Sequence, residues 1–271
     1  MTLNDETHWT NNETRDAWNA NAAFWDEKMG EGNDFVNLLQ WPAILRLLNP
    51  KAGQFILDIA TGNGLTSRRL ASLGAQVEAF DFSSELIKLA KAKPNPESRI
   101  TFRILDATDE SALLSLGEHT FDSALCNMGL FDMADIETLF HALPKLLKPG
   151  AIFVFTLTHP AFNNASCVHV AEERDDQGEI KTIFSVKISR YMSPHLLHGL
   201  AIRGQPKPQL YFERPLQYYF NLAFRSGFVL DGFEECAFPA GAAQKNPLSW
   251  GGNYSEIPPV VAVRCRLSAA S

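Results

Sequence analysis

The chain has 271 residues, of which 45% are hydrophobic and 20% charged, the composition of an ordinary globular protein with a core of useful size. Its net charge of -7 gives no basic surface for nucleic acid, no apolar run is long enough for a membrane span, and the polar, acidic N-terminal stretch is not a signal peptide. The four scattered cysteines form no CxxC pair and indicate neither a metal site nor a disulfide framework, so we expect a cytoplasmic protein.

Two helices are predicted at the N-terminus. In residues 13–30, Trp18, Ala22 and Trp25 fall on one helical face. A second helical segment covers residues 33–50, and Pro42 should kink or split it. We interpret residues 1–50 as a helical lid.

Short apolar runs then alternate with helical patterns through residue 160. Strands are predicted at 54–60, 75–81, 99–107, 120–128 and 151–159, and helices at 64–73, 83–93, 109–117 and 135–147. This alternation predicts right-handed crossovers and a parallel sheet with helices on both faces.

The alternation of strands and helices stops in residues 161–213, which we interpret as an inserted substrate cap. A one-sided strand at 179–189 follows a turn at 175–178 and pairs with a strand from 167, while 193–209 is predicted to be loop with a helical fragment. The apolar face of strand 180–188 is expected to pack on the core or on a second subunit.

The alternation resumes with a helix at 214–228 and two strands, 228–238 and 258–267, which form a hairpin. We therefore predict an α/β fold with a doubly wound, mostly parallel seven-stranded sheet whose last strand is antiparallel. Its core is made of residues 51–160 and 214–271.

The turn after the first strand contains Gly62 and Gly64, where the backbone can pass close to a ligand at the carboxyl end of the sheet. Asp81 ends the second strand, where an acidic group holds ribose hydroxyls. A dinucleotide motif needs a third glycine where Ser67 stands, so the spacing disfavours NAD without excluding it. These residues predict an adenosine-bearing cofactor of open identity.

Two more carboxylates belong to this edge of the sheet. Asp58 lies within the first strand, beneath the glycines, and suits loop amides or an ammonium group. Asp106 ends the third strand, where it can accept a hydrogen bond from an adenine amino group. The fourth strand ends in the sequence CNMGLF.

Five motifs occur in order: ILDIATGNG, AFDFS, LDAT, FDSALCNMGLF and LLKPGAIFVFT. In these motifs the chain resembles the class I S-adenosylmethionine-dependent methyltransferases, in particular their small-molecule branch. Ala60 stands where that family has the first glycine of its motif, which affects loop details. The resemblance implies a Rossmann-like methyltransferase fold, S-adenosylmethionine as cofactor and S-adenosylhomocysteine as product.

The resemblance also implies a set of cofactor-binding residues. The methionine part of the cofactor would contact Ala60, Thr61, Gly62 and Gly64. Asp81 and Phe82 would hold the ribose and flank the adenine, and Asp106 and Ala107 would contact the adenine edge. Asn127 and Met128 would lie near the ribose or the transferred methyl group. Asp58, Asn63 and Ser83, within or beside the same motifs, complete the predicted set.

Aromatic residues of the first helix are candidates to close over the cofactor. An aromatic face attracts a sulfonium as it attracts other cations. Of Trp18, Phe24 and Trp25, we select Trp25 as the lining residue. The alternative is a helix that packs its aromatic stripe on the core.

Methyl transfer is an in-line displacement from an activated sulfonium, so alignment of the two reactants supplies most of the catalysis. A dedicated base is optional. His159, just past the fifth strand on the ligand side, is our candidate general base. The alternative is a histidine that holds the turn before Pro160.

Residues near the cap are less informative. Tyr191, Tyr211, Glu213 and Arg214 are candidates for substrate contacts, with surface or interface roles as the alternative. The H-x-x-H pair at 195–198 lacks further ligands, so no metal is predicted.

The leading hypothesis is methyl transfer to a small-molecule oxygen, nitrogen or carbon nucleophile. The alternatives are a nicotinamide-dependent oxidoreductase and a cofactor-binding protein that has lost methyl transfer. The acidic surface argues against nucleic acid as acceptor. The identity of the acceptor, and whether the protein is a monomer or a homodimer, stay open.

Overall fold

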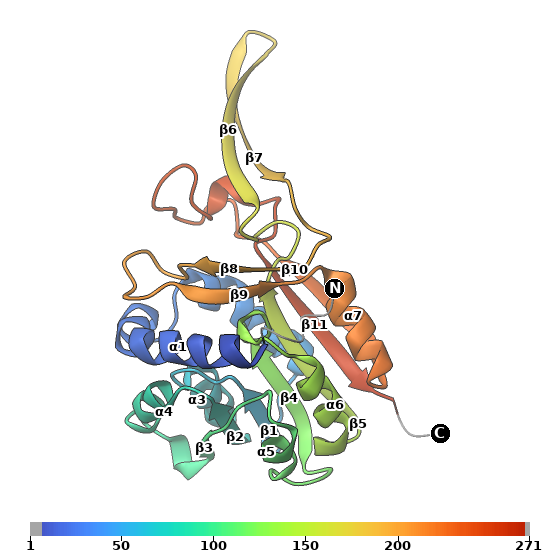
Figure 1. Cartoon of the computed structure of the whole chain (residues 1–271). Coiled ribbons are helices and arrows are strands. Elements are labelled where there is room, and N and C mark those ends of the chain that lie inside the picture. Colours follow the sequence, from blue (N-terminus) through green and yellow to red (C-terminus); the bar gives the residue numbers. More distant parts are fainter. Residues whose placement is uncertain (1–6, 269–271) are drawn as a thin grey trace.

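Seven strands form one sheet through the middle of the computed structural model, which describes residues 7–268 (Figure 1). The strands are β1 (Phe55–Ile59), β2 (Gln76–Asp81), β3 (Ile100–Ile104), β4 (Phe121–Asn127), β5 (Leu147–Thr158), β10 (Phe228–Cys236) and β11 (Val260–Leu267). Their order is β10-β11-β5-β4-β1-β2-β3. Pairing is parallel from β5 to β3, whereas β11 is antiparallel to both neighbours. The predicted sheet is confirmed.

Helices cover both faces of this sheet. They are α2 (Trp41–Leu48), α3 (Leu65–Ser72), α4 (Ser84–Lys91), α5 (Glu110–Leu114), α6 (Glu137–Leu146) and α7 (Leu216–Arg225). Phe153 of β5 packs with α6 and α7, and its neighbour Val154 packs in the cluster of α2 and α3. Consecutive strand residues point to opposite faces, so the doubly wound arrangement is also confirmed.

Among the described residues, three helical segments precede β1: α1 (Thr7–Met29), the π-helix η2 (Phe35–Gln40) and α2. Pro42 lies in the first turn of α2, directly after η2. The backbone stays helical through Gln40 and Trp41, so the segment is not split as expected and instead changes from π-helical to α-helical hydrogen bonding before the proline. Helix α1 packs against α4 and buries Trp18, Ala22 and Leu86 together (Figure 1). Residues 1–6 of the predicted lid and 269–271 of the last core segment lie outside the described residues.

The inserted segment begins with a hairpin of β6 (Cys167–Asp176) and β7 (Glu179–Ile188), which projects away from the sheet (Figure 1). The predicted hairpin is confirmed. Its apolar side chains stay largely uncovered, since Val168 is 59% and Ile180 64% exposed. Contact with the body is made near its base, where the ring of Phe184 lies 5.8 Å from that of Tyr254.

The prediction of a loop with a helical fragment for 193–209 is wrong, because this segment holds a strand and no helix. Residues His195–Gly199 form β8, which pairs with β9 (Gln209–Glu213) in an antiparallel ribbon. Strand β8 has only five residues, and the adjacent apolar pair Leu196 and Leu197 interrupts the alternation that marks a strand. Within the described residues, none of the helices has the length and apolarity needed to cross a membrane.

Candidate active site

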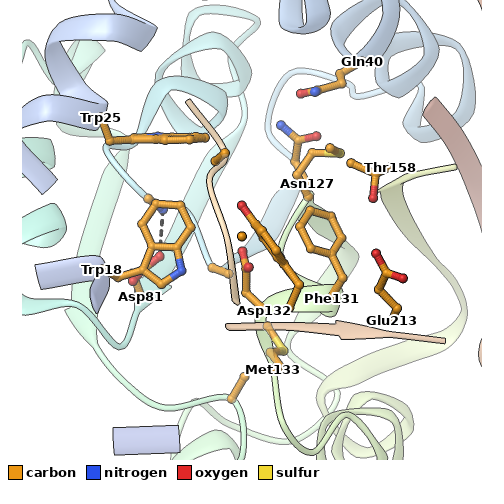
Figure 2. Close-up of a pocket in the computed structure, with 18 of the residues that line it drawn as sticks. Trp18, Trp25, Gln40, Asp81, Asn127, Phe131, Asp132, Met133, Thr158 and Glu213 are labelled. Atoms are coloured by element: carbon orange, nitrogen blue, oxygen red, sulfur yellow. Dashed lines mark hydrogen bonds between the residues drawn. The ribbon is translucent and has the colours of Figure 1, made fainter. Parts of the chain in front are cut away.

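A cavity of about 700 Å³ lies where the parallel strands end (Figure 2). Residues that follow β1, β2, β3, β4 and β5 line one side of it, and residues of α1, β8 and β9 line the other. The cavity lies at the ends of the adjacent strands β1 and β4, where the connections that follow the two strands lead in opposite directions along the sheet. Ligands of open α/β sheets bind at this point.

Asp58 organises the turn after β1. Its carboxylate, which is 1% exposed, accepts hydrogen bonds from the hydroxyls of Thr61 at 2.8 Å and of Ser67. Burial raises the pKa of Asp58 to about 6, against the opposing effect of these hydrogen bonds. The backbone turns through left-handed conformations at Ala60 (φ 54°) and Gly62 (φ 59°), so the alanine adopts the conformation that suits glycine.

Asp81 closes the same turn from the end of β2. Its Oδ2 accepts from the amide of Gly62 and its Oδ1 from the amide of Ser83, both at 2.9 Å. Burial raises the pKa of Asp81 to about 6, the two amides oppose this rise, and the charges of Asp58 and Asp106 add to it. The carboxyl group therefore lies at the wall of the cavity where an adenosine ribose is bound in this class of sheet.

Asp106, at the bottom of the cavity, is hydrogen-bonded to a residue of α1. Its carboxylate accepts from the Nδ2 atom of Asn11 at 2.6 Å, and from the amide and hydroxyl of Thr108 at 2.9 and 2.8 Å. A second tie joins the hydroxyl of Ser83 to Oδ1 of Asn19 at 2.7 Å. Both asparagines belong to α1, so this helix closes one end of the cavity.

Two tryptophans of α1 face the cavity. The rings of Trp18 and Trp25 meet edge to face with centroids 5.1 Å apart, beside Phe82 (Figure 2). Phe24 is not part of the cavity wall, and the Nζ atom of Lys28 lies 5.5 Å from its ring centroid. Among the three aromatic candidates, the cavity therefore favours Trp18 and Trp25.

Asn127 and Met128 reach the cavity from the end of β4. Oδ1 of Asn127 accepts from the hydroxyl of Thr156 at 2.6 Å, which fixes the amide. Met128 has a left-handed backbone (φ 61°). Figure 2 shows Asn127 on the opposite side of the cavity from Trp18 and Trp25.

Most of the predicted cofactor residues meet in this wall. They are Trp25, Asp58, Ala60, Thr61, Gly62, Asn63, Asp81, Phe82, Asp106, Ala107, Asn127 and Met128. Gly64 and Ser83 lie behind the wall. A Cβ on Gly64 (φ 74°) would stand 2.9 Å from the ring of Phe102, and the Ser83 hydroxyl caps α4 by accepting from the amide of Leu86.

His159 also lies outside the cavity wall. Its Nε2 donates to Glu235 at 3.0 Å, its Nδ1 accepts from the amide of Ala161 at 3.1 Å, and the ring is 2% exposed beside Phe162. Burial lowers its pKa in spite of the nearby Glu235 carboxylate. Because both ring nitrogens have partners, the geometry favours the structural role over that of a base.

The residues named in the sequence analysis as candidates for substrate contacts all line the cavity: Tyr191, Tyr211, Glu213 and Arg214. The Nε2 atom of His195 lies 2.8 Å from Oε2 of Glu213, and its Nδ1 lies 3.0 Å from the carbonyl oxygen of Ser193. This pair joins β8 to β9 above the cavity. Within residues 7–268, no cluster of three or more His, Cys, Asp or Glu side chains is arranged to hold a metal.

Arg214 fastens the cap to the loop that follows β4. Its guanidinium is buried and donates to the carbonyl oxygens of Met133 at 2.9 Å, Ala134 at 2.8 Å and Leu130 at 3.3 Å. The rings of Phe212 and Tyr218 flank it at 5.5 Å. These hydrogen bonds connect the loop at 128–134 to the residue that directly follows β9.

Sequence reasoning missed several residues of the wall: Gln40, Phe131, Asp132, Met133 and Thr158 (Figure 2). Asp132 had a usable signal, because it is a charged residue within an apolar stretch directly after a predicted strand. Gln40 had none, since it comes from the π-helical segment before Pro42.

Comparison with known proteins agrees with this geometry. Residues 57–155 match the family described as "Methyltransferase domain". Over 112 residues the chain is 34% identical to a demethylmenaquinone methyltransferase of Clavibacter sepedonicus, covering 41% of this chain and 44% of that protein. Over 110 residues it is 36% identical to a ubiquinone biosynthesis O-methyltransferase of Xanthomonas oryzae pv. oryzae, covering 39% and 44%. The match thus spans less than half the length of these relatives.

Solved structures extend the likeness to most of the chain. An S-adenosylmethionine-dependent methyltransferase from Mesorhizobium loti is 25% identical with a TM-score of 0.66, over 84% of this chain and 97% of that one. A SAM-dependent methyltransferase from Aquifex aeolicus is 13% identical with a TM-score of 0.55, over 89% and 96%, and shows the shared fold alone.

Proposed function

We propose that this chain, which contains a class I S-adenosylmethionine-dependent methyltransferase domain, transfers a methyl group from S-adenosylmethionine to a small-molecule acceptor. The observation that carries the proposal is the position of Asp81 at the end of β2. Its carboxylate accepts a hydrogen bond from the amide of Gly62, and the residue lines the cavity. In this position it accepts hydrogen bonds from the ribose hydroxyls.

The residues of the wall fit this cofactor. When bound, S-adenosylmethionine supplies a methyl carbon attached to a positively charged sulfur. The carboxyl groups of Asp58, Asp81, Asp106 and Asp132 all line the cavity, and they favour a cationic ligand. Trp18 and Trp25 offer aromatic surface to the adenosine or the sulfonium.

The first contribution of the protein to catalysis is the alignment of the two reactants. Asp81 and Asp106 hold one reactant from the floor, while α1, β8 and β9 keep water from that side of the cavity. Fixing two reactants in an attack geometry contributes on the order of 7–11 kcal/mol, which is the main catalytic effect in our proposal.

The acceptor is proposed to be a ring compound. The two relatives described above act, by their names, on demethylmenaquinone and in ubiquinone biosynthesis. The acceptor end of this cavity has the rings of Phe131, Tyr191, Tyr211 and Trp250 in its wall, which suits a flat apolar body. Of these four rings, Tyr191, Tyr211 and Trp250 lie outside the matched family region 57–155.

A nicotinamide-dependent oxidoreductase is the weaker candidate. Its third motif glycine is replaced by Ser67, whose hydroxyl is buried and bonded to Asp58. The division into a lid (1–50), a core (51–160 and 214–271) and a substrate cap (161–213) is part of the proposal. So are a cytoplasmic location and a monomer or homodimer that binds neither nucleic acid nor membranes.

A thermal-shift comparison tests the cofactor, with S-adenosylmethionine, S-adenosylhomocysteine, NAD and NADP at equal concentrations. A ligand at 100 times its dissociation constant adds about 2.7 kcal/mol, which raises the midpoint by about 5 °C or more. A rise with the two sulfur compounds alone supports the proposal. A rise with a nicotinamide cofactor alone would overturn it.

A further inference from the structure

Asp132 differs from the other acids of the cavity. It follows β4, at the end of the short helix η4 (Leu130–Asp132). Its Oδ1 atom is buried without a hydrogen-bond partner, and no ion pair to this carboxyl is found among the described residues. The residue is only partly buried and lines the cavity (Figure 2), and no hydrogen bond to its other oxygen, Oδ2, is found among the described residues, so Oδ2 is the atom left open to a ligand.

The remaining acids of the wall all have partners. Asp58 accepts from two hydroxyls, Asp81 from two backbone amides, and Asp106 from Asn11 and Thr108. At Glu213, Oε1 accepts from the amide of Ala165 at 2.6 Å, while Oε2 is buried without a hydrogen-bond partner and lies 2.8 Å from Nε2 of His195. A polar atom buried without a hydrogen-bond partner typically costs about 1–3 kcal/mol, so a carboxyl group without any donor in the cavity wall points to a donor on the ligand.

The position of Asp132 suits the acceptor. In Figure 2 it lies between Trp18 and Trp25 on one side and Thr158 and Glu213 on the other. Its neighbours Phe131 and Met133 also line the cavity, and the ring of Phe131 lies 5.8 Å from that of Tyr211. A flat apolar body beside these side chains brings one polar hydrogen to the carboxylate.

We propose that Asp132 takes the proton of the acceptor, and that the acceptor is a neutral molecule whose nucleophile is a hydroxyl group on a flat apolar ring. The inference rests on the proposed methyl transfer. The acceptor oxygen forms the new bond to the methyl carbon as the bond from that carbon to sulfur breaks. The bonding electron pair stays on sulfur, and the O–H proton passes to the Asp132 carboxylate.

Oxygen is favoured because of where its proton must go. A hydroxyl must lose its proton as it is methylated, whereas a neutral amine keeps its own as an ammonium product. An unpaired carboxylate in the wall serves the first reaction and repels a carboxylate acceptor. Burial, together with the charge of Asp81, raises the pKa of Asp132 well above its usual value, which makes it a stronger base.

The charged and titratable groups around Asp132 come from three elements. Asp81 reaches it from β2, Tyr211 from β9 and Cys126 from β4. Burial raises the pKa values of Tyr211 and Cys126, so both stay neutral. The guanidinium of Arg214 is held by the carbonyls of Leu130, Met133 and Ala134, which fixes the loop that carries Asp132.

The test compares the wild type with Asp132→Asn, and uses Asp135→Asn as the matched control. Asp135 lies on the same loop but outside the cavity wall, where its carboxylate accepts from the amides of Glu137 and Thr138. The probes are catechol and 1,4-dihydroxynaphthalene, with aniline and benzoate as matched ring compounds. Asp132→Asn should lower kcat by about 10²–10⁴-fold with the hydroxyl probes and abolish the acid limb of the pH profile. Asp135→Asn should keep kcat.

A second readout does not depend on activity. Removing an unpaired buried carboxylate should raise the melting temperature of Asp132→Asn at neutral pH by about 2–4 °C, and the difference should shrink at acid pH. Affinity for S-adenosylmethionine should stay within about tenfold of the wild type. A kcat that survives the substitution, a lowered melting temperature or a greater loss of cofactor affinity would overturn the role of Asp132.

The two levels of the proposal fail differently. Wild-type protein that methylates aniline but neither hydroxyl probe would overturn the inference and leave methyl transfer standing. Wild-type protein that methylates none of the four probes and does not bind S-adenosylmethionine would overturn the proposed function, and the inference with it. Binding of S-adenosylmethionine without transfer to either hydroxyl probe would overturn the inference alone.

Discussion

The backbone amide of Gly62 donates to the Asp81 carboxylate across 2.9 Å, so the turn after β1 is tied to the end of β2. One carboxyl group therefore shapes the turn and belongs to a residue of the cavity wall. Substituting it should weaken cofactor binding through both effects.

Asp81→Asn is expected to raise the dissociation constant of S-adenosylmethionine by about 10–100-fold, because hydrogen bonds to a charged group contribute about 1.5–3 kcal/mol. Isothermal titration calorimetry measures the change. Asp109→Asn is the matched control, since Asp109 caps α5 by accepting from the amide of Ala112 and lies outside the cavity wall. Equal affinities of the two variants would show that Asp81 does not bind the cofactor.

Cofactor affinity should depend on pH through Asp81, whose pKa is raised to about 6 by burial. The ionised carboxylate accepts hydrogen bonds from a ligand, so the affinity should be constant above this value. It should fall by about tenfold per pH unit below it. Calorimetry between about pH 5 and about pH 8 checks the curve, and Asp81→Asn should flatten it.

The same raised pKa values change the stability of the ligand-free protein with pH in the direction opposite to the change in cofactor affinity. Burial raises the pKa values of both Asp58 and Asp81 from 3.8 to about 6. Their contribution to the free energy of unfolding is therefore greatest below the unfolded value and is lost as the pH rises through the folded one. The stabilisation by cofactor should accordingly increase between about pH 5 and about pH 7, and a constant stabilisation would contradict this account.

Trp25→Ala should weaken binding of S-adenosylmethionine more than that of S-adenosylhomocysteine, because only the first carries the sulfonium charge. A cation–aromatic contact contributes about 0.5–2 kcal/mol, or roughly 2- to 30-fold in affinity. Phe24→Ala removes a ring from the same helix outside the cavity wall and should change neither affinity. An equal loss for the two ligands would assign Trp25 to the adenosine instead.

Arg214→Met should destabilise the fold by about 3 kcal/mol, because it leaves buried carbonyl oxygens of the β4–α6 loop without a donor. The melting temperature should fall by about 2–4 °C for each kcal/mol. Arg225→Met removes an exposed arginine at the end of α7 and serves as the control. Similar melting temperatures for both variants would contradict the anchoring role.

Shortening the β6–β7 hairpin should leave the site intact. Residues 174–181 do not line the cavity, and an Asn-Gly turn can join Glu173 to its partner Thr182. Affinity for S-adenosylmethionine should be unchanged. A matching deletion in the β8–β9 turn removes Leu200, Ala201 and Ile202 from the wall and should lower acceptor turnover. Loss of cofactor binding in the shortened hairpin would show that it supports the site.

Much of the fold could be predicted from local patterns. Buried parallel strands are continuous apolar runs, and Ser83 before Glu85 marks the start of α4. The strand β8 could not be predicted, because it is held by pairing with β9 across the β8–β9 turn rather than by its own alternation. Tertiary pairing of this kind leaves little trace in a five-residue sequence.

The part of the cavity wall that we propose to bind the cofactor was predictable for the same reason, because most of its residues follow strand ends in chain order. The acceptor end was not. Asp132 from the segment after β4, Thr158 from the end of β5 and Gln40 from the segment before Pro42 come together in one cavity wall only through the tertiary fold. His159 has the right residue type and the right strand end, but its ring turns away to Glu235. The position of a residue in the sequence predicts the strand end at which it lies, but it does not predict the direction in which its side chain points.

The most direct measurement is transfer of label from methyl-labelled S-adenosylmethionine to 1,4-dihydroxynaphthalene, followed by mass spectrometry of the product. The account predicts an O-methyl product formed together with S-adenosylhomocysteine by the wild type, and a rate reduced with Asp81→Asn at limiting cofactor. Tight binding of S-adenosylmethionine without label in any of the ring compounds would contradict methyl transfer to such acceptors.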